Sequence, residues 1–370
     1  MSSPRRCWVE VDGRALRRNF KILRGLIPRT TQIMAVVKAN AYGHGLVTMA
    51  QEFEAIGTDW LGVANVAEGV ALRKAGVTLP ILLLSVTLPE EMEDAIRHKL
   101  TLTLSSYDEA ETLDRIARVM KRKVEVHFKI DTGMGRLGCW HLKAKEELIR
   151  IRSLPGLLVK GLYTHFASAD DNAELTRKQW RSVAPFFAKN ADLLCHAANS
   201  PAVTRRYGFH ADLVRLGLSL YGIAPNPADQ GIGLQPVLTW KSRVTLLHDV
   251  SRGRTVSYGA TYRVPSTQRH AVVAMGYGDG YFRLHSNASH MLVRGIRCPI
   301  RGRVTMDQII LDVTKVPGCR VGDEVVALGI QRGEKIQTRE LALQAHTIPW
   351  EILTNIGARV PRFYKNFRSV

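Results

Sequence analysis

The chain has 370 residues and a formal net charge of +19, and its 45% hydrophobic and 23% charged residues are typical of a globular protein with a sizeable core. No stretch approaches the roughly 20 apolar residues of a membrane span, and the basic residues are scattered rather than gathered with aromatic residues on one element, so the charge alone predicts no nucleic-acid site. The five cysteines form no CxxC pair, which argues against a disulfide framework or a metal site, and charges interrupt the basic start before a signal-peptide core, so we expect a cytoplasmic protein.

From about residue 33 to residue 222, short apolar runs alternate with amphipathic ones. The amphipathic runs predict helices, as where Ser106 stands as an N-cap with Glu109 in capping-box spacing. Alternating strands and helices predict a (β/α)₈ barrel, although an open doubly wound sheet has the same alternation. The predicted strands are residues 33–38, 61–64, 81–85, 100–104, 124–131, 159–166, 193–200 and 213–222.

Polar residues stand at the ends of five of these predicted strands. Taken singly, each has an ordinary explanation, such as a satisfied core histidine, a helix N-cap or a salt-bridged arginine. The carboxyl ends of barrel strands meet at one face, however, so these side chains are expected to converge on one pocket. They are Lys38; Lys129 and Asp131, with Arg136 just beyond; His165; Asn199 and Ser200; and Arg215 with Gly217.

Lys38 ends the first of these strands and is followed by a turn that contains Gly43 and Gly45. Burial lowers the pKa of a lysine and makes its amine a usable nucleophile or base. The ordinary alternative is a strand-end lysine whose amine reaches water. The residues around Lys38 therefore determine whether its amine is a buried reactive group or one that reaches water.

After residue 222 the pattern changes to a linker rich in Pro, Gly and Asn, which extends to residue 236. Beyond it, apolar runs without long helical spacers predict a mainly β domain with two short helices near 338–345 and 349–356. We expect domains at 1–235 and 236–370, with residues 1–12 as candidates for pairing with the β domain. The β-type runs are 238–250, 269–275, 290–293, 308–313 and 324–328.

Over nearly its whole length the chain resembles the alanine racemase family, whose fold-type III enzymes use pyridoxal phosphate (PLP). In the barrel the resemblance rests on AVVKANAYGHG at 35–45, KIDTGMGRLG at 129–138, YTHFA at 163–167 and VRLG at 214–217. In the β domain it rests on VSYGATY at 256–262, GYGDG at 276–280 and RVTMD at 303–307. The resemblance implies an isomerase that interconverts L-alanine and D-alanine and supplies D-alanine for cell-wall peptidoglycan.

The resemblance also implies roles for single residues around PLP. Lys38 holds the cofactor covalently and acts as one base, while Tyr258 serves the opposite face of the substrate. Arg215 faces the pyridine nitrogen and, because a guanidinium cannot accept a proton, keeps that nitrogen unprotonated. His165 links Arg215 to Tyr258 by hydrogen bonds. The other implied cofactor contacts are Tyr42, Asn199, Ser200, Gly217 and Leu218.

On the substrate side, the resemblance implies that Arg136 and the Met306 backbone amide bind the carboxylate. Tyr277 and Asp307 would line the access corridor. Lys129 matches a position that is often carbamylated, which would replace a cation with an anion able to orient Arg136.

The resemblance implies a homodimer in which Tyr258 comes from the partner subunit, so each site needs both chains. One departure is Ala358, at a position where some relatives carry a tyrosine that narrows the entrance and helps to hold the phosphate. How strictly the site selects alanine is therefore open. The alternatives are a racemase of another small amino acid such as serine, a non-catalytic PLP-binding protein and, most remotely, a nucleic-acid-binding module.

Overall fold

The computed structural model describes residues 6–226 and 231–368 and divides into two compact units. The barrel unit comprises residues 16–41, 45–235 and 368–370, and the β unit comprises residues 1–15, 42–44 and 236–367. The predicted linker contains residues 227–230, which lie outside the described residues. No helix in the described part of the chain is long and apolar enough to cross a membrane.

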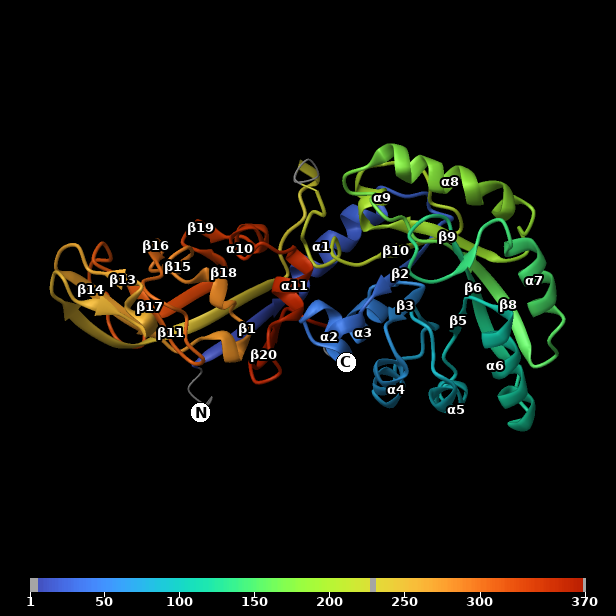
Figure 1. The fold of residues 1–370 in the computed structure, drawn as a ribbon, viewed down its shortest axis with the longest axis horizontal. Coiled ribbons are helices and arrows are strands. Elements are labelled where there is room, and N and C mark those ends of the chain that lie inside the picture. The colour runs from blue at the N-terminus through green and yellow to red at the C-terminus, as the bar shows by residue number, and fades with distance from the viewer. Residues whose placement is uncertain (1–5, 227–230, 369–370) are drawn as a thin grey trace. The chain divides into compact units, whose positions relative to one another are not determined.

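The strands of the barrel unit form one parallel sheet in the order β4-β3-β2-β10-β9-β8-β6-β5 (Figure 1). A parallel bridge between Leu82 and Thr101 joins β4 to the start of β5 and closes the sheet into a barrel. The closure excludes the open doubly wound alternative, because that fold leaves two free edges. The strands are β2 (Gln32–Val36), β3 (Trp60–Val63), β4 (Ile81–Leu83), β5 (Leu102–Leu104), β6 (Val124–Asp131) with the short β7 (Cys139–Trp140) beside it, β8 (Leu157–Tyr163), β9 (Leu194–Asn199) and β10 (Leu213–Leu216).

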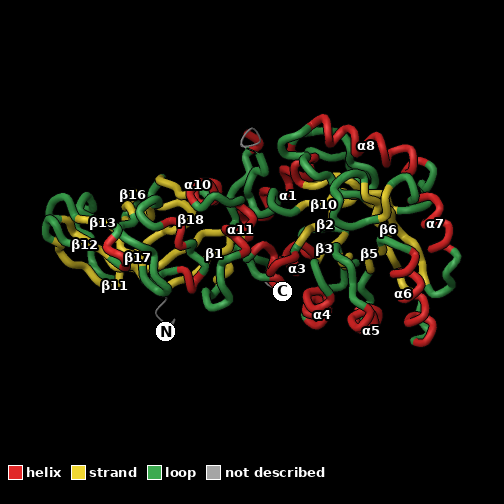
Figure 2. The backbone as a smooth tube through the Cα atoms, in the orientation of Figure 1, coloured by secondary structure: helices red, strands yellow, loops and turns green. Residues whose placement is uncertain are grey.

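Helices follow the strands and surround the barrel (Figure 2). The predicted N-cap is confirmed at Ser106, whose hydroxyl accepts the Glu109 N–H at 3.3 Å. Asn65 and Asn172 cap two further helices in the same way. The helices are α1 (Gly13–Arg24), α3 (Leu46–Ala55), α4 (Val66–Lys74), α5 (Pro89–Arg97), α6 (Tyr107–Val119), α7 (Ala144–Arg152), α8 (Ala173–Ala188) and α9 (Ser200–Thr204).

Several barrel strands end earlier than predicted. Strand β2 ends at Val36 rather than at residue 38, and β8 ends at Tyr163 rather than at residue 166. Lys38 and His165 therefore lie in the loops just beyond their strands, whereas Lys129 and Arg215 lie within theirs. The carboxyl-end loops are where a barrel enzyme places its functional side chains.

Lys38 begins a short turn, α2 (Lys38–Tyr42), whose backbone is left-handed. Ala39, Asn40 and Ala41 have φ of 54°, 54° and 52°, a conformation that costs an L-residue roughly 1–2 kcal/mol. Hydrogen bonds hold the turn: Ala41 N–H donates to the Val37 oxygen at 2.7 Å, and the Asn40 side-chain oxygen accepts the Leu46 N–H at 2.8 Å. A strained turn that its surroundings fix is typical of a functional site.

The β unit is built around the long strand β11 (Leu238–Val250), which pairs with β1, β14 and β18. Strand β1 (Cys7–Asp12) lies antiparallel to β11 and parallel to β20 (Arg362–Lys365). Together with the barrel, this unit confirms the predicted fold class. Its other strands are β12 (Thr255–Val256), β13 (Tyr262–Arg263), β14 (Gln268–Val273), β15 (His290–Val293), β16 (Ile296–Pro299), β17 (Ile309–Asp312), β18 (Glu324–Gln331) and β19 (Glu334–Ile336), and its helical elements are η2 (Tyr258–Ala260), η3 (Tyr277–Asp279), η4 (Arg283–His285), α10 (Thr338–Gln344) and α11 (Pro349–Thr354).

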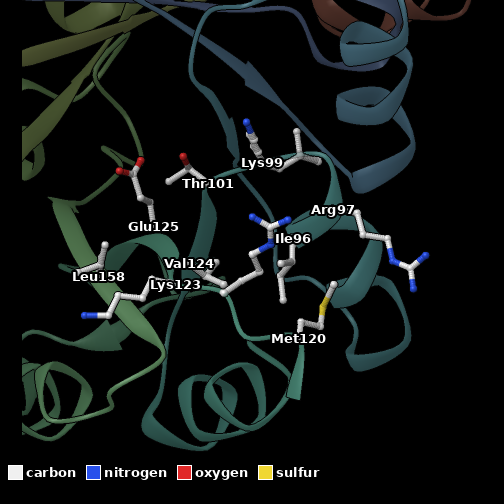
Figure 3. A pocket seen from close by; sticks show the side chains of 11 residues that line it. Ile96, Arg97, Lys99, Thr101, Met120, Lys123, Val124, Glu125 and Leu158 are labelled. Carbon is white, nitrogen blue, oxygen red and sulfur yellow. The ribbon is translucent and has the colours of Figure 1, made fainter. Parts of the chain in front are cut away.

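A cavity of about 720 Å³ opens at the amino-terminal ends of β5 and β6 (Figure 3). Its lining includes the cationic side chains of Arg97, Lys99, Arg122 and Lys123, together with the carboxylate of Glu125. The polar residues of the predicted pocket stand at the other end of the strands. This cavity is therefore not the predicted active site.

The left-handed turn predicts the effect of an exposed substitution, Ala39→Gly. Glycine adopts positive φ without a steric penalty, so this variant should raise the free energy of unfolding by about 1 kcal/mol. Urea unfolding would measure the change. The matched control is Ala71→Gly in the right-handed helix α4, which should lower the free energy of unfolding by about 1 kcal/mol. Destabilisation of both variants to the same extent would contradict a strained turn at Ala39.

Candidate active site

Arg215 lies at the centre of the polar groups inside the barrel. Its side chain is buried in β10, and burial lowers its pKa to about 10. One terminal nitrogen donates to the backbone oxygens of Thr164 at 2.7 Å and Ala197 at 2.9 Å. Among the described residues no carboxylate pairs with this guanidinium, and its Nε–H has no acceptor. Arg215 is thus a buried cation with a donor left for a ligand.

Arg215 fixes the tautomers of three histidines, of which His127 and His196 are buried and His165 is half-buried. It donates to Nδ1 of His196 at 2.8 Å and to Nδ1 of His165 at 3.2 Å, so both rings carry their hydrogen on Nε2. The Nε2–H of His196 then donates to Nδ1 of His127 at 2.9 Å. Burial, and then the charge of Arg215, lowers the pKa of all three histidines, that of His127 to about 3. Two neutral rings, His165 and His196, therefore hold the cation in place, and His127 accepts a hydrogen bond from His196.

A glycine makes room for the last ring of this chain. A Cβ added to Gly161 would lie 2.7 Å from atoms of the His127 ring, so only glycine allows the approach. The middle part of the chain of rings is also packed, because the ring of Tyr163 stacks on that of His196 with centroids 4.7 Å apart and planes 2° apart. The sequence analysis missed His127 and His196, because a histidine inside a strand looks like an ordinary core residue. Their distances from His165 along the chain follow no strand or helix period, so the spacing gives no signal.

Lys38 stands half-buried at the start of the left-handed turn. Burial lowers the pKa of its amine, and the nearby charge of Arg136 lowers it further, while Glu68 acts in the opposite direction. Glu68 is itself held by the backbone N–H groups of Asn40 and Ala64, at 3.3 and 2.9 Å. At a given pH, the neutral amine, which is the nucleophilic and basic form, is therefore more populated in Lys38 than in an ordinary lysine.

Lys129 is a second buried amine, inside β6. Burial and then the charges of Arg215 and Arg136 lower its pKa to about 7, against a smaller opposing effect of Asp131. Arg136 is exposed and has no hydrogen bond or ion pair with any residue that the structure describes. Lys129, Arg136 and Arg215 thus act on one region, where the charge of Asp131 does not balance theirs. Such a region favours the binding of an anion.

A group of free donors follows β10. The Gly217 N–H donates to the Ser200 hydroxyl oxygen at 2.9 Å, which leaves the Ser200 O–H free to donate. Within the described residues, the N–H groups of Leu218 and Ser219 have no acceptor, and the buried Ser219 hydroxyl has no partner. Such donors at the start of a turn attract a phosphate. Asn199, by contrast, caps α9, since its side-chain oxygen accepts the Ala202 N–H at 3.2 Å.

The sequence analysis did not name Ser219. Its signal was its position two residues after Gly217, at the carboxyl end of the eighth barrel strand, where barrels commonly bind phosphate.

In the β unit, Tyr258 is 71% exposed in the turn η2. Its neighbours Ser257 and Gly259 have φ of 63° and 71°, and the Ser257 hydroxyl donates to the Arg303 oxygen at 2.7 Å. The Tyr258 hydroxyl has no partner in the part of the chain that the structure describes. A strained, anchored turn thus presents an unpaired phenol at the surface of its unit.

Tyr277, Met306 and Asp307 lie together in the β unit. The Tyr277 N–H donates to the Thr305 oxygen at 3.0 Å, and Arg359 donates to the Asp307 carboxylate at 2.8 Å. The side chains of Tyr277 and Met306 are 44% and 53% exposed. Among the described residues the Met306 N–H has no acceptor, so it is free to bind a carboxylate.

The remaining predicted residues are also in the β unit. Tyr42 is buried there, and burial raises the pKa of its phenol. Ala358 lies exposed in the turn between α11 and β20. The predicted site residues therefore divide into two groups, with Tyr42, Tyr258, Tyr277, Met306 and Asp307 in the β unit and the others in the barrel unit.

Comparisons with known proteins give one result over the whole chain. Residues 11–225 match the family "Alanine racemase, N-terminal domain", and residues 237–364 match "Alanine racemase, C-terminal domain". The alanine racemase of Methylacidiphilum infernorum is 44% identical over 364 residues, which cover 98% of this chain and 94% of its own. That of Halothermothrix orenii is 42% identical over 97% of both chains.

Solved structures agree with the sequence comparisons. The alanine racemase of Clostridium difficile 630 superposes with a TM-score of 0.92 at 33% identity, over 99% of this chain and 96% of that one. The alanine racemase of Bacillus anthracis with bound L-Ala-P has a TM-score of 0.91 at 34% identity, over 100% of this chain and 97% of that one.

The pKa of Lys129 predicts how Lys129→Met changes the dependence of stability on pH. Between pH 7 and the ordinary lysine value of 10.5, the unfolded chain binds more protons at Lys129 than the folded chain does, so folding becomes more favourable as pH rises. Methionine removes this effect. In buffers free of CO₂, the variant should be more stable than the parent at pH 6.5, and the difference should shrink towards pH 10. Urea unfolding across this range would measure it, and a difference independent of pH would contradict the assigned pKa.

Proposed function

The chain belongs to the alanine racemase family, and from this premise we propose that its barrel holds PLP and that Lys38 and Tyr258 act on opposite faces of the bound amino acid. The family's enzymes depend on PLP, and the reaction is the interconversion of L-alanine and D-alanine by an isomerase. The observation that carries the residue assignment is Arg215, a buried cation that neutral histidines orient and that forms no ion pair with a carboxylate of the described residues.

The donors of the barrel unit fit PLP at three points. The unpartnered donors of Leu218 and Ser219, together with the Ser200 hydroxyl, suit the phosphate. The free Nε–H of Arg215 suits the pyridine nitrogen, and the Lys38 amine suits covalent attachment. When bound, PLP withdraws electrons from the substrate Cα and so makes its proton removable. Asn199 supports the phosphate donors indirectly, because it caps the helix α9, which begins with Ser200.

Arg215 sets the electronic character of the bound cofactor. At physiological pH it stays protonated, because its lowered pKa of about 10 is still well above 7. A guanidinium can donate but cannot accept, so the pyridine nitrogen stays unprotonated. A guanidinium at this position would therefore make the bound cofactor a weaker electron acceptor, which would limit side reactions such as transamination. His165 and His196 hold the guanidinium in this role.

Two groups are needed because racemisation removes a proton from one face of Cα and returns one to the other. Lys38 serves one face with an amine whose pKa is lowered by burial and by the charge of Arg136. Tyr258 serves the other with its exposed phenol. Because Nδ1 of His165 accepts from Arg215, its Nε2–H is free to donate to the phenol oxygen. This hydrogen bond would stabilise the phenolate form.

The substrate carboxylate is assigned to Arg136 and to the Met306 N–H, both of which lack a partner among the described residues. Lys129 is assigned as a carbamate. With a pKa of about 7 its amine is largely available to attack CO₂, with loss of a proton, and the product is an anion beside Arg136 and Arg215. This step would supply the negative charge that the region lacks.

A homodimer completes the site in this proposal. Tyr258, Tyr277 and Met306 are large side chains exposed in their own unit, which is typical of an interface. Tyr258 would enter the partner's barrel, and Tyr277 and Asp307 would line the access corridor. The product D-alanine serves peptidoglycan synthesis, and we place the enzyme in the cytoplasm. A non-catalytic PLP carrier accounts for the barrel but not for the second domain.

Replacement of the phenol, Tyr258→Phe, tests the second acid/base group. Loss of a positioned proton donor lowers kcat by about 10²–10⁴-fold, while the visible absorption of bound PLP should stay at the parent level. Formation of D-alanine from L-alanine would be measured, with serine as a comparison substrate. A kcat within twofold of the parent would remove Tyr258 from the mechanism, and a higher kcat/KM for serine than for alanine would identify a serine racemase.

Mixing two inactive variants tests the shared site. If Tyr258 acts on the partner's Lys38, a heterodimer of Lys38→Ala and Tyr258→Phe subunits has one site with both groups intact. Random mixing should then restore about a quarter of the parent activity. Each variant alone is the control. If both groups came from one chain, every site would lack one of them and no activity would return.

A further inference from the structure

A second cavity, of about 440 Å³, opens between α8 and the segment that links α9 to β10. Its volume lies within the range usual for small-molecule sites. Every lining residue is an arginine or an aromatic residue, and none has been placed in the candidate active site. The lining, here named the arginine–aromatic pocket, consists of Arg177, Trp180, Arg181, Arg205, Arg206, Tyr207 and Phe209.

The aromatic residues of the pocket form a stack. The rings of Trp180 and Phe209 have centroids 5.1 Å apart and planes 16° apart, and those of Phe209 and Tyr207 are 5.7 Å and 18° apart. Phe209 is the middle ring, so Trp180 and Tyr207 are the two ends. Trp180 is only half-buried. A partly exposed ring at the end of a stack is a surface on which a planar base can add.

The arginines supply positive charge that no carboxylate of the described residues neutralises through an ion pair. The side chains of Arg177, Arg181 and Arg206 are exposed and form no hydrogen bond or ion pair with any described residue, and the Arg177 guanidinium lies 5.9 Å from the centre of the Tyr207 ring. Arg205 is anchored, because it donates to the Asp170 backbone oxygen. Guanidinium groups bind phosphate through two parallel hydrogen bonds, which makes arginine well suited to this ligand.

Two further features indicate that the segment 205–209 is built for a purpose other than packing. Arg206 has a φ of 54°, which is unfavourable for a residue with a Cβ. The Tyr207 hydroxyl is buried and, among the described residues, has no hydrogen-bond partner. Strain and an unsatisfied polar group both cost stability, and both commonly accompany a binding site.

We propose that the arginine–aromatic pocket binds a nucleoside phosphate. The base stacks on the exposed ring of Trp180, and the phosphates bind Arg177, Arg181 and Arg206. The larger cavity near Lys99 and Glu125 lacks this combination, because no aromatic residue lines it and it contains a carboxylate (Figure 3). The pocket is thus a binding site separate from the racemase chemistry and independent of the residues assigned to it.

Calorimetry on the full-length holoenzyme can separate the two parts of the proposed ligand. The probes are ATP, tripolyphosphate for the charge alone, and adenosine for the base alone. ATP should bind at least about tenfold more tightly than either of the others, since it uses both the stack and the arginines. Equal affinity of ATP and tripolyphosphate would reduce the pocket to a general anion site and overturn the proposal, as would no binding of ATP.

Variants locate the binding. Arg181→Gln with Arg206→Gln should weaken ATP binding at least about tenfold, and Trp180→Leu should weaken ATP but not tripolyphosphate. The matched control removes the same charge at the other cavity, with Lys99→Gln and Arg122→Gln, and should leave ATP affinity unchanged. Circular dichroism and racemase activity without ATP should match the parent for all variants that are compared. An equal loss in the control would assign the effect to net charge and contradict the proposal.

Discussion

A buried arginine organises the interior of the barrel, and it has no carboxylate partner in the part of the chain that the structure describes. Arg215 is held by two backbone oxygens and by the Nδ1 atoms of His165 and His196. Because a guanidinium only donates, it fixes which nitrogen of each ring carries hydrogen. The tautomer of His127 is fixed in turn, because its Nδ1 accepts a hydrogen bond from the Nε2–H of His196. A carboxylate in place of the two histidine nitrogens would have neutralised the cation. The tautomers of the histidines would then no longer be fixed by Arg215.

The charge of Arg215 acts on Lys129, the buried lysine of β6. Together with burial, it lowers the pKa of Lys129 to about 7, and Arg136 adds to the same effect on both Lys129 and Lys38. A lowered pKa makes such an amine more reactive, because a larger fraction of it is neutral at a given pH. The excess of positive charge also makes the pocket attractive to anions, and a phosphate, a carboxylate and a carbamate each fit one part of it. A single electrostatic constraint therefore connects cofactor binding, substrate binding and the reactivity of the lysines.

The sequence predicted the parts of this arrangement that depend on motif and periodicity. The barrel, the β domain, the cap at Ser106 and the position of Lys38 at the carboxyl end of a buried strand all follow from alternation and from turn residues, although the strand ends two residues earlier than predicted. The left-handed turn at 39–42 was not predictable, because alanine gives no signal for positive φ. His127 and His196 were missed because their role depends on a contact between strands distant in the chain. Short strands such as β16 and β19 carry too few residues for a period to be seen.

The most direct test of the account is to identify the lysine that carries the cofactor. The holoenzyme would be reduced with borohydride, digested and analysed by peptide mass spectrometry. Among the described residues of the barrel, the half-buried Lys38 and the buried Lys129 are the lysines with a lowered pKa, so the experiment chooses between them. The account predicts a pyridoxyl group on Lys38 alone. A label on Lys129, or no label on either lysine, would contradict it.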